Sequence, residues 1–241
     1  MLAGFGTKRA KRGLAAGLVL AGMQVGLPGA VSAQSLGKHQ EHTQASLGVR
    51  TSLVSDAGYD PYAEDNVLTQ GSVGLSRTLF AEGEWSMAAA AGFDFGGVSA
   101  TVRGEHSELD LYRFGLAPEA RFHLLPRLYF LGRLGPTLSR DRVKVYDSAA
   151  ATDLSSAGWT FGFDSALGAA YEVIGKTSGA NHGTRGWVQL EFGYGWSASR
   201  DITLEPRGDD ADAAPERVNG VSMPALAIRG PAVKVAVAAS F

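Results

Sequence analysis

The sequence predicts an all-β protein, an eight-stranded antiparallel transmembrane β-barrel with up-and-down meander order. Three observations predict this fold. Apolar residues alternate with polar or small ones in eight segments, which is the period of a β-strand. The connections are mostly long and short in turn, as in barrels with short turns on one side of a membrane and long loops on the other. Beyond residue 33 no apolar run approaches the ~20 residues of a spanning helix, so a membrane route requires a closed barrel.

The first 33 residues are expected to be a secretory signal peptide, cleaved near Ala33. A basic cluster at 8–12 precedes an apolar stretch at 13–30, and small residues occupy 31–33. An N-terminal membrane anchor is the alternative, which Gly, Gln and Pro within the apolar stretch disfavour. Residues 34–42 are predicted to be a periplasmic lead-in, and the barrel is expected at 43–241.

Charge and composition narrow the function. Cleavage removes four basic residues and no acidic one, so the formal net charge changes from −2 to −6. This acidic balance argues against a nucleic-acid partner. The chain has no Cys, so packing and hydrogen bonds must hold the exported fold without disulfides. No metal or cofactor is expected, because the histidines lack metal-ligand spacing: His39, His42, His123 and His182.

The first half of the predicted barrel contains four alternating segments, at 43–54, 66–80, 84–96 and 108–123. A polar loop follows the first, a tight turn precedes the third, and a loop near 97–107 precedes the fourth. Each has one apolar face and one face of small or charged residues, which predicts a strand between two environments. The apolar faces contain Leu47, Val49, Val73, Leu75, Met87, Phe93, Phe114 and Leu116.

The second half repeats the pattern, at 127–140, 157–173, 186–199 and 223–241. Long loops are expected at 141–156 and at the acidic 200–222, with a Gly-rich turn at 174–186. The apolar faces contain Phe130, Leu134, Phe161, Phe163, Leu167, Leu190, Phe192, Val235 and Val237.

The last segment changes phase within its length. Leu226 and Ile228 are out of step with Val233 and the residues after it. A one-residue bulge at Gly230-Pro231 would restore the alternation and turn Arg229 inward. Proline cannot donate to a ladder, and a closed barrel has no edge strand to hold it. Irregular pairing is therefore expected at Pro118, Pro136 and Pro231.

A soluble barrel of the lipocalin type alternates as well, with its apolar face inward. Aromatic residues at both ends of the apolar face favour a lipid-facing surface, because membrane barrels have two interfacial girdles. Near the presumed periplasmic turns they are Trp85, Phe122, Phe130, Tyr171, Trp187 and Phe241. Near the outer loops they are Phe93, Phe95, Tyr112, Trp159, Tyr194 and Trp196. Arg77 shares this face near a turn, where it could extend to the headgroups.

The opposite face predicts a narrow lumen that contains charges of both signs. Eight strands leave room for side chains rather than a wide pore, so these charges must pair or stay hydrated. Ion pairs are expected for Glu119 with Arg133, Glu191 with Lys234, and Asp94 with Arg113; a small gated pore is the alternative. The inward charges are Arg50, Asp94, Arg113, Glu119, Arg121, Arg133, Asp164, Glu172, Glu191 and Lys234.

Two short sequences suggest chemistry outside the lumen. Arg207-Gly208-Asp209 in the acidic loop is a weak adhesion candidate, since three residues match by chance easily. His106-Ser107-Glu108 resembles a hydrolase set, but adjacent residues of a strand point to opposite faces, which separates a base from its nucleophile. No catalytic residue is therefore assigned, and no enzymatic activity is expected.

The signal peptide, the eight alternating segments and the terminal Phe241 resemble the small outer-membrane barrel proteins of the OmpA transmembrane-domain and OmpX type. The resemblance implies the cell outer membrane of a Gram-negative bacterium, lipid and lipopolysaccharide as neighbours, and assembly machinery that recognises Phe241. The expected function is a structural or surface-interaction role through extracellular loops. A small pore or lipophile transporter and a lipid A-modifying hydrolase are the alternatives.

Overall fold

The computed structural model describes residues 43–102, 105–147, 152–175, 184–206 and 220–241. The described residues all belong to one compact unit within Ser35–Phe241. The predicted signal peptide, the lead-in and the triplet at 207–209 lie outside the described residues. Within the described ranges, no helix is long and apolar enough to cross a membrane.

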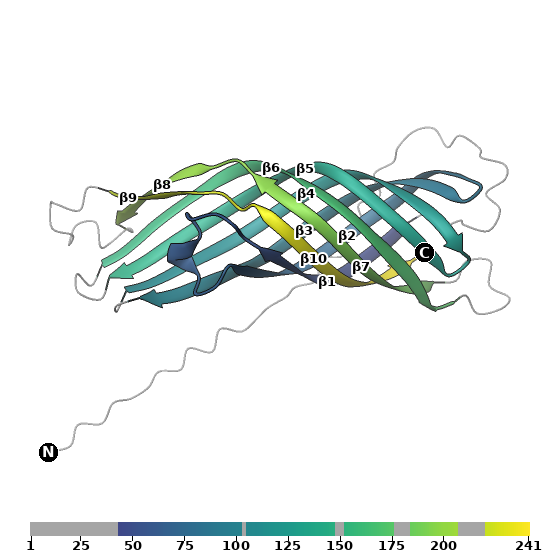
Figure 1. The fold of residues 1–241 in the computed structure, drawn as a ribbon, viewed down its shortest axis with the longest axis horizontal. Helices are drawn as coiled ribbons and strands as arrows, with labels where there is room; N and C mark the ends of the chain where they lie inside the picture. The colour runs from purple at the N-terminus through teal and green to yellow at the C-terminus, as the bar shows by residue number, and fades with distance from the viewer. Residues whose placement is uncertain (1–42, 103–104, 148–151, 176–183, 207–219) are drawn as a thin grey trace, which may run out of the picture. The chain divides into compact units, whose positions relative to one another are not determined.

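Eight antiparallel strands close a ring, which confirms the predicted fold class (Figure 1). Each ring strand pairs with the next one along the chain, and β10 pairs with β1 to complete the circle. The ring strands are β1 (Thr43–Leu53), β2 (Val67–Glu82), β3 (Trp85–Val102), β4 (Glu105–Leu125), β5 (Leu128–Asp147), β6 (Thr152–Ile174), β7 (Arg185–Ser197) and β10 (Gly230–Ser240).

Two further strands and a short helix lie at one end of the barrel. The strands β8 (Arg200–Pro206) and β9 (Val221–Leu226) form a hairpin, and β8 pairs with β6 at Ser155↔Glu205. The 3₁₀ helix η1 (Asp60–Tyr62) lies between β1 and β2. We call this the loop end; the turn end, with Gly83 and the C-terminus, is opposite (Figure 1).

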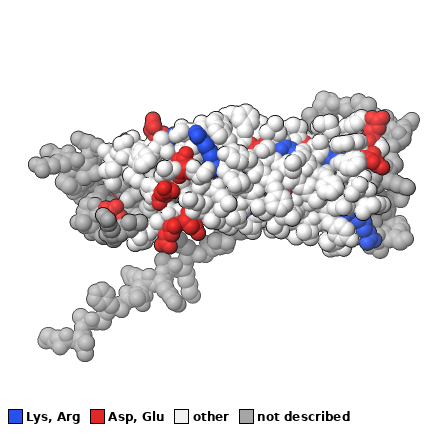
Figure 2. Space-filling model, viewed as in Figure 1, with Lys and Arg blue, Asp and Glu red and all other residues white. Residues whose placement is uncertain are grey.

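The outward face of the barrel wall is an apolar belt. Side chains such as Leu47, Phe114 and Leu167 are exposed along the middle of the strands, and Figure 2 shows the charged residues mainly toward the two ends. An apolar surface this continuous is unfavourable in water and suits the hydrocarbon of a membrane. The girdle assignment of Trp187 was wrong: this ring is 2% exposed and points into the lumen, because its parity is that of Gln189 and Glu191.

The two faces of β4, β5 and β6 exchange character at one row of paired residues, Tyr112–Arg140–Trp159. Toward the turn end, the outward face is apolar and the lumen is polar. Toward the loop end, the outward row is Asp110–Arg142–Ala157, while Leu109 and Val143 are fully buried inside. The part of the barrel beyond this row, which we call the head, therefore has the polarity of a water-soluble barrel.

This reversal corrects the predicted loops. The expected loops near 97–107 and at 141–156 are mostly strand, because β3 to β6 continue into the head. The expected loop at 200–222 likewise begins and ends as β8 and β9, in which Ile202, Leu204 and Leu226 are buried. The alternation persists in these stretches, but the apolar residues occupy the opposite parity.

The predicted change of phase in the last segment is present as a break rather than a bulge. Residues 227–229 separate β9 from β10, and Gly230 has a φ of 151°. Arg229 does not turn inward: its guanidinium lies 5.6 Å from the ring centroid of the outward-facing Trp196. Pro231 pairs with Tyr194 and lies just beyond the end of the β1–β10 ladder, where its missing N–H has little cost.

Proline also interrupts the wall between β4 and β5, as predicted. The ladder runs to Gly115↔Thr137 and resumes at Glu119↔Arg133. Pro118 and Pro136 lie in the rows between, and neither can donate a backbone hydrogen bond. We call this stretch the proline seam.

Gly230→Ala is expected to destabilise the barrel by more than about 2 kcal/mol, through the cost of an unfavourable backbone angle together with a clash. An added Cβ would lie 1.8 Å from the Leu53 carbonyl oxygen. Gly83→Ala is the matched control: its φ is 59° but nothing lies within 4 Å, so backbone strain alone should cost about 1 kcal/mol. Urea unfolding in lipid vesicles measures both, and equal losses would contradict the role of the Leu53 contact.

Candidate functional site

Strand parity directs all ten predicted lumen charges toward the barrel axis. Arg133 and Asp164 are half-buried and the other eight are buried. They come from β1, β3, β4, β5, β6, β7 and β10, so nearly every ring strand contributes. The lumen is the candidate site because it brings these residues together from across the chain.

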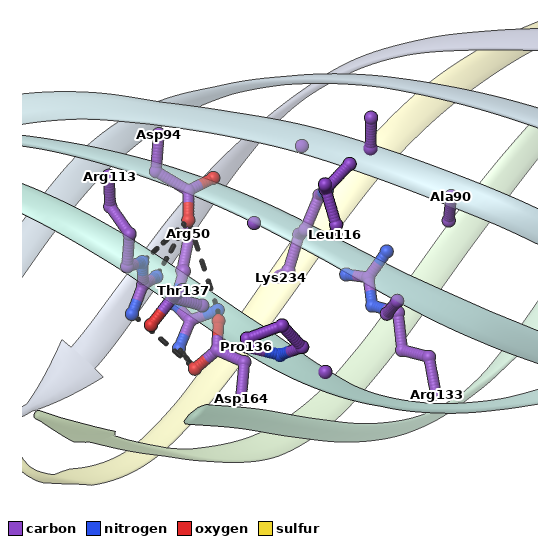
Figure 3. A pocket seen from close by; sticks show the side chains of 15 residues that line it. Arg50, Ala90, Asp94, Arg113, Leu116, Arg133, Pro136, Thr137, Asp164 and Lys234 are labelled. Atoms are coloured by element: carbon purple, nitrogen blue, oxygen red, sulfur yellow. Dashed lines mark hydrogen bonds and ion pairs between the residues drawn. The ribbon is translucent and has the colours of Figure 1, made fainter. Parts of the chain in front are cut away.

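Two arginines and two aspartates form a network across the middle of the lumen (Figure 3). Arg50 donates to both carboxylate oxygens of Asp164, at 2.8 and 3.0 Å. Arg113 donates to Asp94 at 2.6 Å and reaches Asp164 at 3.4 Å, while Arg50 lies 3.9 Å from Asp94. Each carboxylate thus faces both guanidiniums, and the planar donors of arginine suit such shared contacts.

The Asp94–Arg113 pair is one of the three ion pairs expected from strand register. The other two are replaced. Glu119 and Arg133 are register partners, but Glu119 accepts from Arg121 at 2.6 Å and Arg133 donates across the lumen to Glu191. A long arginine can span a narrow barrel, so contact across the axis competes with contact along the wall.

This exchange leaves Lys234 near Glu191 but outside its ion pair with Arg133. It stands opposite Glu191 in the β7–β10 ladder, but Glu191 already accepts from Arg133. Lys234 is 6% exposed. Among the residues that the structure describes, none forms a hydrogen bond or an ion pair with its ammonium. It lines a small cavity of about 60 Å³, together with Arg50 and Arg133 (Figure 3).

The turn end of the lumen is closed by a polar and aromatic layer. Tyr129 is fully buried; its hydroxyl donates to Gln44 and accepts from Gln189, both at 3.1 Å. The Arg121 guanidinium lies 5.3 Å from the Tyr129 ring centroid. The indole of Trp187 donates to Ser240 at 3.1 Å. Because these groups bind one another, the layer is cross-linked from strand to strand.

The loop end is closed by the apolar core of the head. Tyr59 lies just before η1 and Tyr62 lies within it, and both are 0% exposed. They belong to a core cluster with Val54 and with residues from six strands. Ser107 donates to the Pro61 carbonyl at 2.6 Å, which fastens this segment to β4. Burial raises the pKa of Tyr62 to about 12 and raises the pKa of Tyr59 further. The strand residues of the core are Leu68, Leu109, Leu111, Val143, Leu154, Ile202, Leu204 and Leu226.

One buried ion pair in the head was missed from the sequence. Arg200 donates to both carboxylate oxygens of Asp141, which is 2% exposed, and its side chain packs against Gly158. Both residues fall in stretches predicted to be loops, 141–156 and 200–222. The alternation predicted for 127–140 places Ser139 inward, and the next inward position is Asp141. Continuing this alternation past residue 140 would have identified Asp141 as a lumen residue.

The other candidates do not assemble a site. His106 is exposed and hydrogen bonds with Thr101 at 3.1 Å, whereas Ser107 points inward. Glu108 pairs with Lys144 at 2.7 Å on the outward face. The serine and the histidine therefore lie on opposite faces, as strand geometry requires.

An open groove of about 990 Å³ lies on the outward face where the barrel changes polarity. Arg140 and Arg142 line it, with Tyr112 and Trp159 at its apolar edge and Glu205 at its polar edge. The Arg140 guanidinium lies 5.6 Å from the Trp159 ring centroid. Neither arginine forms an ion pair with another residue of the described ranges.

No family model and no curated protein matches the chain. Among solved structures, the chain is similar to Ail, the attachment invasion locus protein of Yersinia pestis, with 11% identity, 83% of this chain and 97% of that chain covered, and a TM-score of 0.42. It is similar to the outer membrane protease OmpT from Escherichia coli, with 9% identity, coverage of 86% and 99%, and a TM-score of 0.46. It is also similar to Neisserial surface protein A, with 13% identity, coverage of 83% and 97%, and a TM-score of 0.41. The assignment of the fold rests on the strand pairing of this chain itself.

Proposed function

We propose that this protein is a closed outer-membrane barrel with a structural or surface-interaction role, which it performs through the head. The observation that carries the proposal is the exchange of polarity at the row Tyr112–Arg140–Trp159. A strand needs only about 9–11 residues to cross a membrane, and β4, β5 and β6 have 21, 20 and 23. The remaining length forms a folded, water-facing surface with its own core.

The filled lumen supports a closed barrel rather than the alternative pore. An eight-stranded barrel has room for side chains only. The lumen of this barrel is occupied by the apolar core of the head, the arginine–aspartate network and the polar and aromatic layer that contains Tyr129. An ion would have to displace buried, hydrogen-bonded charges to pass, and each broken pair leaves an uncompensated charge.

Lipid partners fit the outward groove. Its two arginines face outward at the level where the apolar belt ends, which is the depth of lipid headgroups. Guanidinium binds phosphate with high geometric specificity. We therefore propose outer-membrane lipid, with the phosphates of lipopolysaccharide, as the partner of this groove. The assembly machinery is the proposed partner of the C-terminal strand that ends on Phe241.

In planar bilayers the refolded barrel is expected to show no steady nanosiemens-scale openings, because its lumen is closed by layers of different chemistry. A porin inserted under the same conditions controls for incorporation. Steady openings in the unaltered protein would defeat the closed-barrel proposal and favour the pore.

The double change Arg140→Ala/Arg142→Ala is expected to reduce the lipopolysaccharide that copurifies with the barrel. Each basic residue near an anionic membrane surface contributes about 1 kcal/mol, so retention should fall roughly tenfold or more. Arg77→Ala is the matched control, because Arg77 is also exposed on the outward face but lies toward the turn end. Native mass spectrometry measures the retention, and an equal loss in the control would contradict a specific groove.

The surface-interaction role is tested by replacing 207–219 with a short Gly-Ser linker. This change retains β9 and also β8 with its buried Ile202 and Leu204, which removal of all of 200–222 would delete. Cells that display the shortened barrel are expected to attach less to animal cells. Asp209→Glu separates the triplet from the rest of the segment. Heat modifiability on gels checks that the cells carry equal amounts of folded barrel. Unchanged attachment at equal amounts would count against this role.

A further inference from the structure

The cavity beside Lys234 has two unlike walls. One wall contains charged residues of the lumen, and the other consists of small inward residues from β3, β4 and β5 beside the proline seam. The small residues leave about 60 Å³ open, which is enough for a small ion with a few waters but not for a sugar or a lipid headgroup. They are Ala90, Gly92, Gly115, Ala117 and Gly135.

The charges around this space do not balance. Arg50 and Arg113 are matched by Asp94 and Asp164, which also line the cavity. Arg133 forms an ion pair with Glu191. The buried Lys234 ammonium is therefore an excess positive charge. In Figure 3 the dashed lines join the two arginines and two aspartates, and none reaches Lys234.

An isolated charge away from bulk water has a high energy unless a counter-charge accompanies it. We propose that the cavity binds a small monovalent anion, of halide or small-carboxylate size, between the Lys234 ammonium and the Arg133 guanidinium. The anion completes the charge balance of the lumen in a barrel that stays closed. This site is independent of the head and of the outward groove.

The placement of the anion follows from the surrounding groups. Every guanidinium nitrogen of Arg50 and of Arg113 donates to a neighbouring side chain, five of the six bonds going to Asp94 or Asp164, so these two arginines are held in the network. Arg133 donates to Glu191 through Nη2 and retains further N–H groups. The carboxylates of Asp94 and Asp164 line the network side of the cavity. The anion is therefore expected on the side of Lys234 and Arg133.

The test refolds the barrel in sodium bromide and locates bromide in crystals by anomalous diffraction. The expected result is a peak in the lumen in contact with the Lys234 Nζ. Lys234→Met removes the charge while keeping the length of the side chain, and should abolish this peak. Ala90→Leu fills the cavity from the opposite wall without changing any charge, and should abolish it as well. Lys144→Met, a change of an outward lysine paired with Glu108, should retain it.

A second measurement works without crystals. Replacing gluconate by bromide or formate at constant ionic strength should raise the thermal unfolding midpoint of the unaltered barrel and of Lys144→Met by several degrees, since an anion that binds only the folded state stabilises it. The midpoints of Lys234→Met and Ala90→Leu should not respond. Response to bromide alone identifies a halide site, and response to both identifies a general monoanion site. No lumen peak in the unaltered protein, or equal responses in all four proteins, would overturn the proposal.

Discussion

One set of strands must satisfy two solvents, and this constraint shapes the whole barrel. Backbone groups in hydrocarbon need partners within the protein, so the ring closes through β1 and β10, from Gln44↔Ser240 to Ser52↔Ala232. The same strands then leave the hydrocarbon and enter water. Their backbone pairing continues unchanged, so the adjustment falls on the side chains, and the apolar residues move from the outside to the inside at Tyr112–Arg140–Trp159.

The contents of the lumen follow from this exchange. In the head the interior can be apolar, and Tyr59 and Tyr62 complete an ordinary hydrophobic core. Inside the belt the interior is polar, and the charges there bind one another across the axis. Buried ion pairs of this kind add little net stability against apolar replacements, but a mismatched pair is costly, so they favour one arrangement of the strands.

Alternation predicted the ring, its strand order and the direction of the ten lumen charges, because parity is a local property of a strand. It did not predict the extent of the strands into the head, where apolar residues occupy the other parity and the outward residues resemble a polar loop. It also did not predict which charges meet. Strand register correctly placed Glu119 beside Arg133. Arg133 pairs with Glu191 instead, and this depends on the width of the lumen and the length of an arginine side chain. Trp187 was misplaced because aromatic character outweighed parity in its assignment.

The proline seam gives the wall an uneven mechanical stiffness. A closed hydrogen-bonded ring resists radial strain equally at every ladder only if every ladder is continuous. Between Gly115↔Thr137 and Glu119↔Arg133 it is not, and close packing of Gly135 on Ala117 holds the strands together there instead. This gap is longer than the single register shifts in the described β2–β3 and β6–β7 ladders, so van der Waals contact bears the lateral pressure of the bilayer there, and the junction of β4 and β5 should yield more easily than its neighbours.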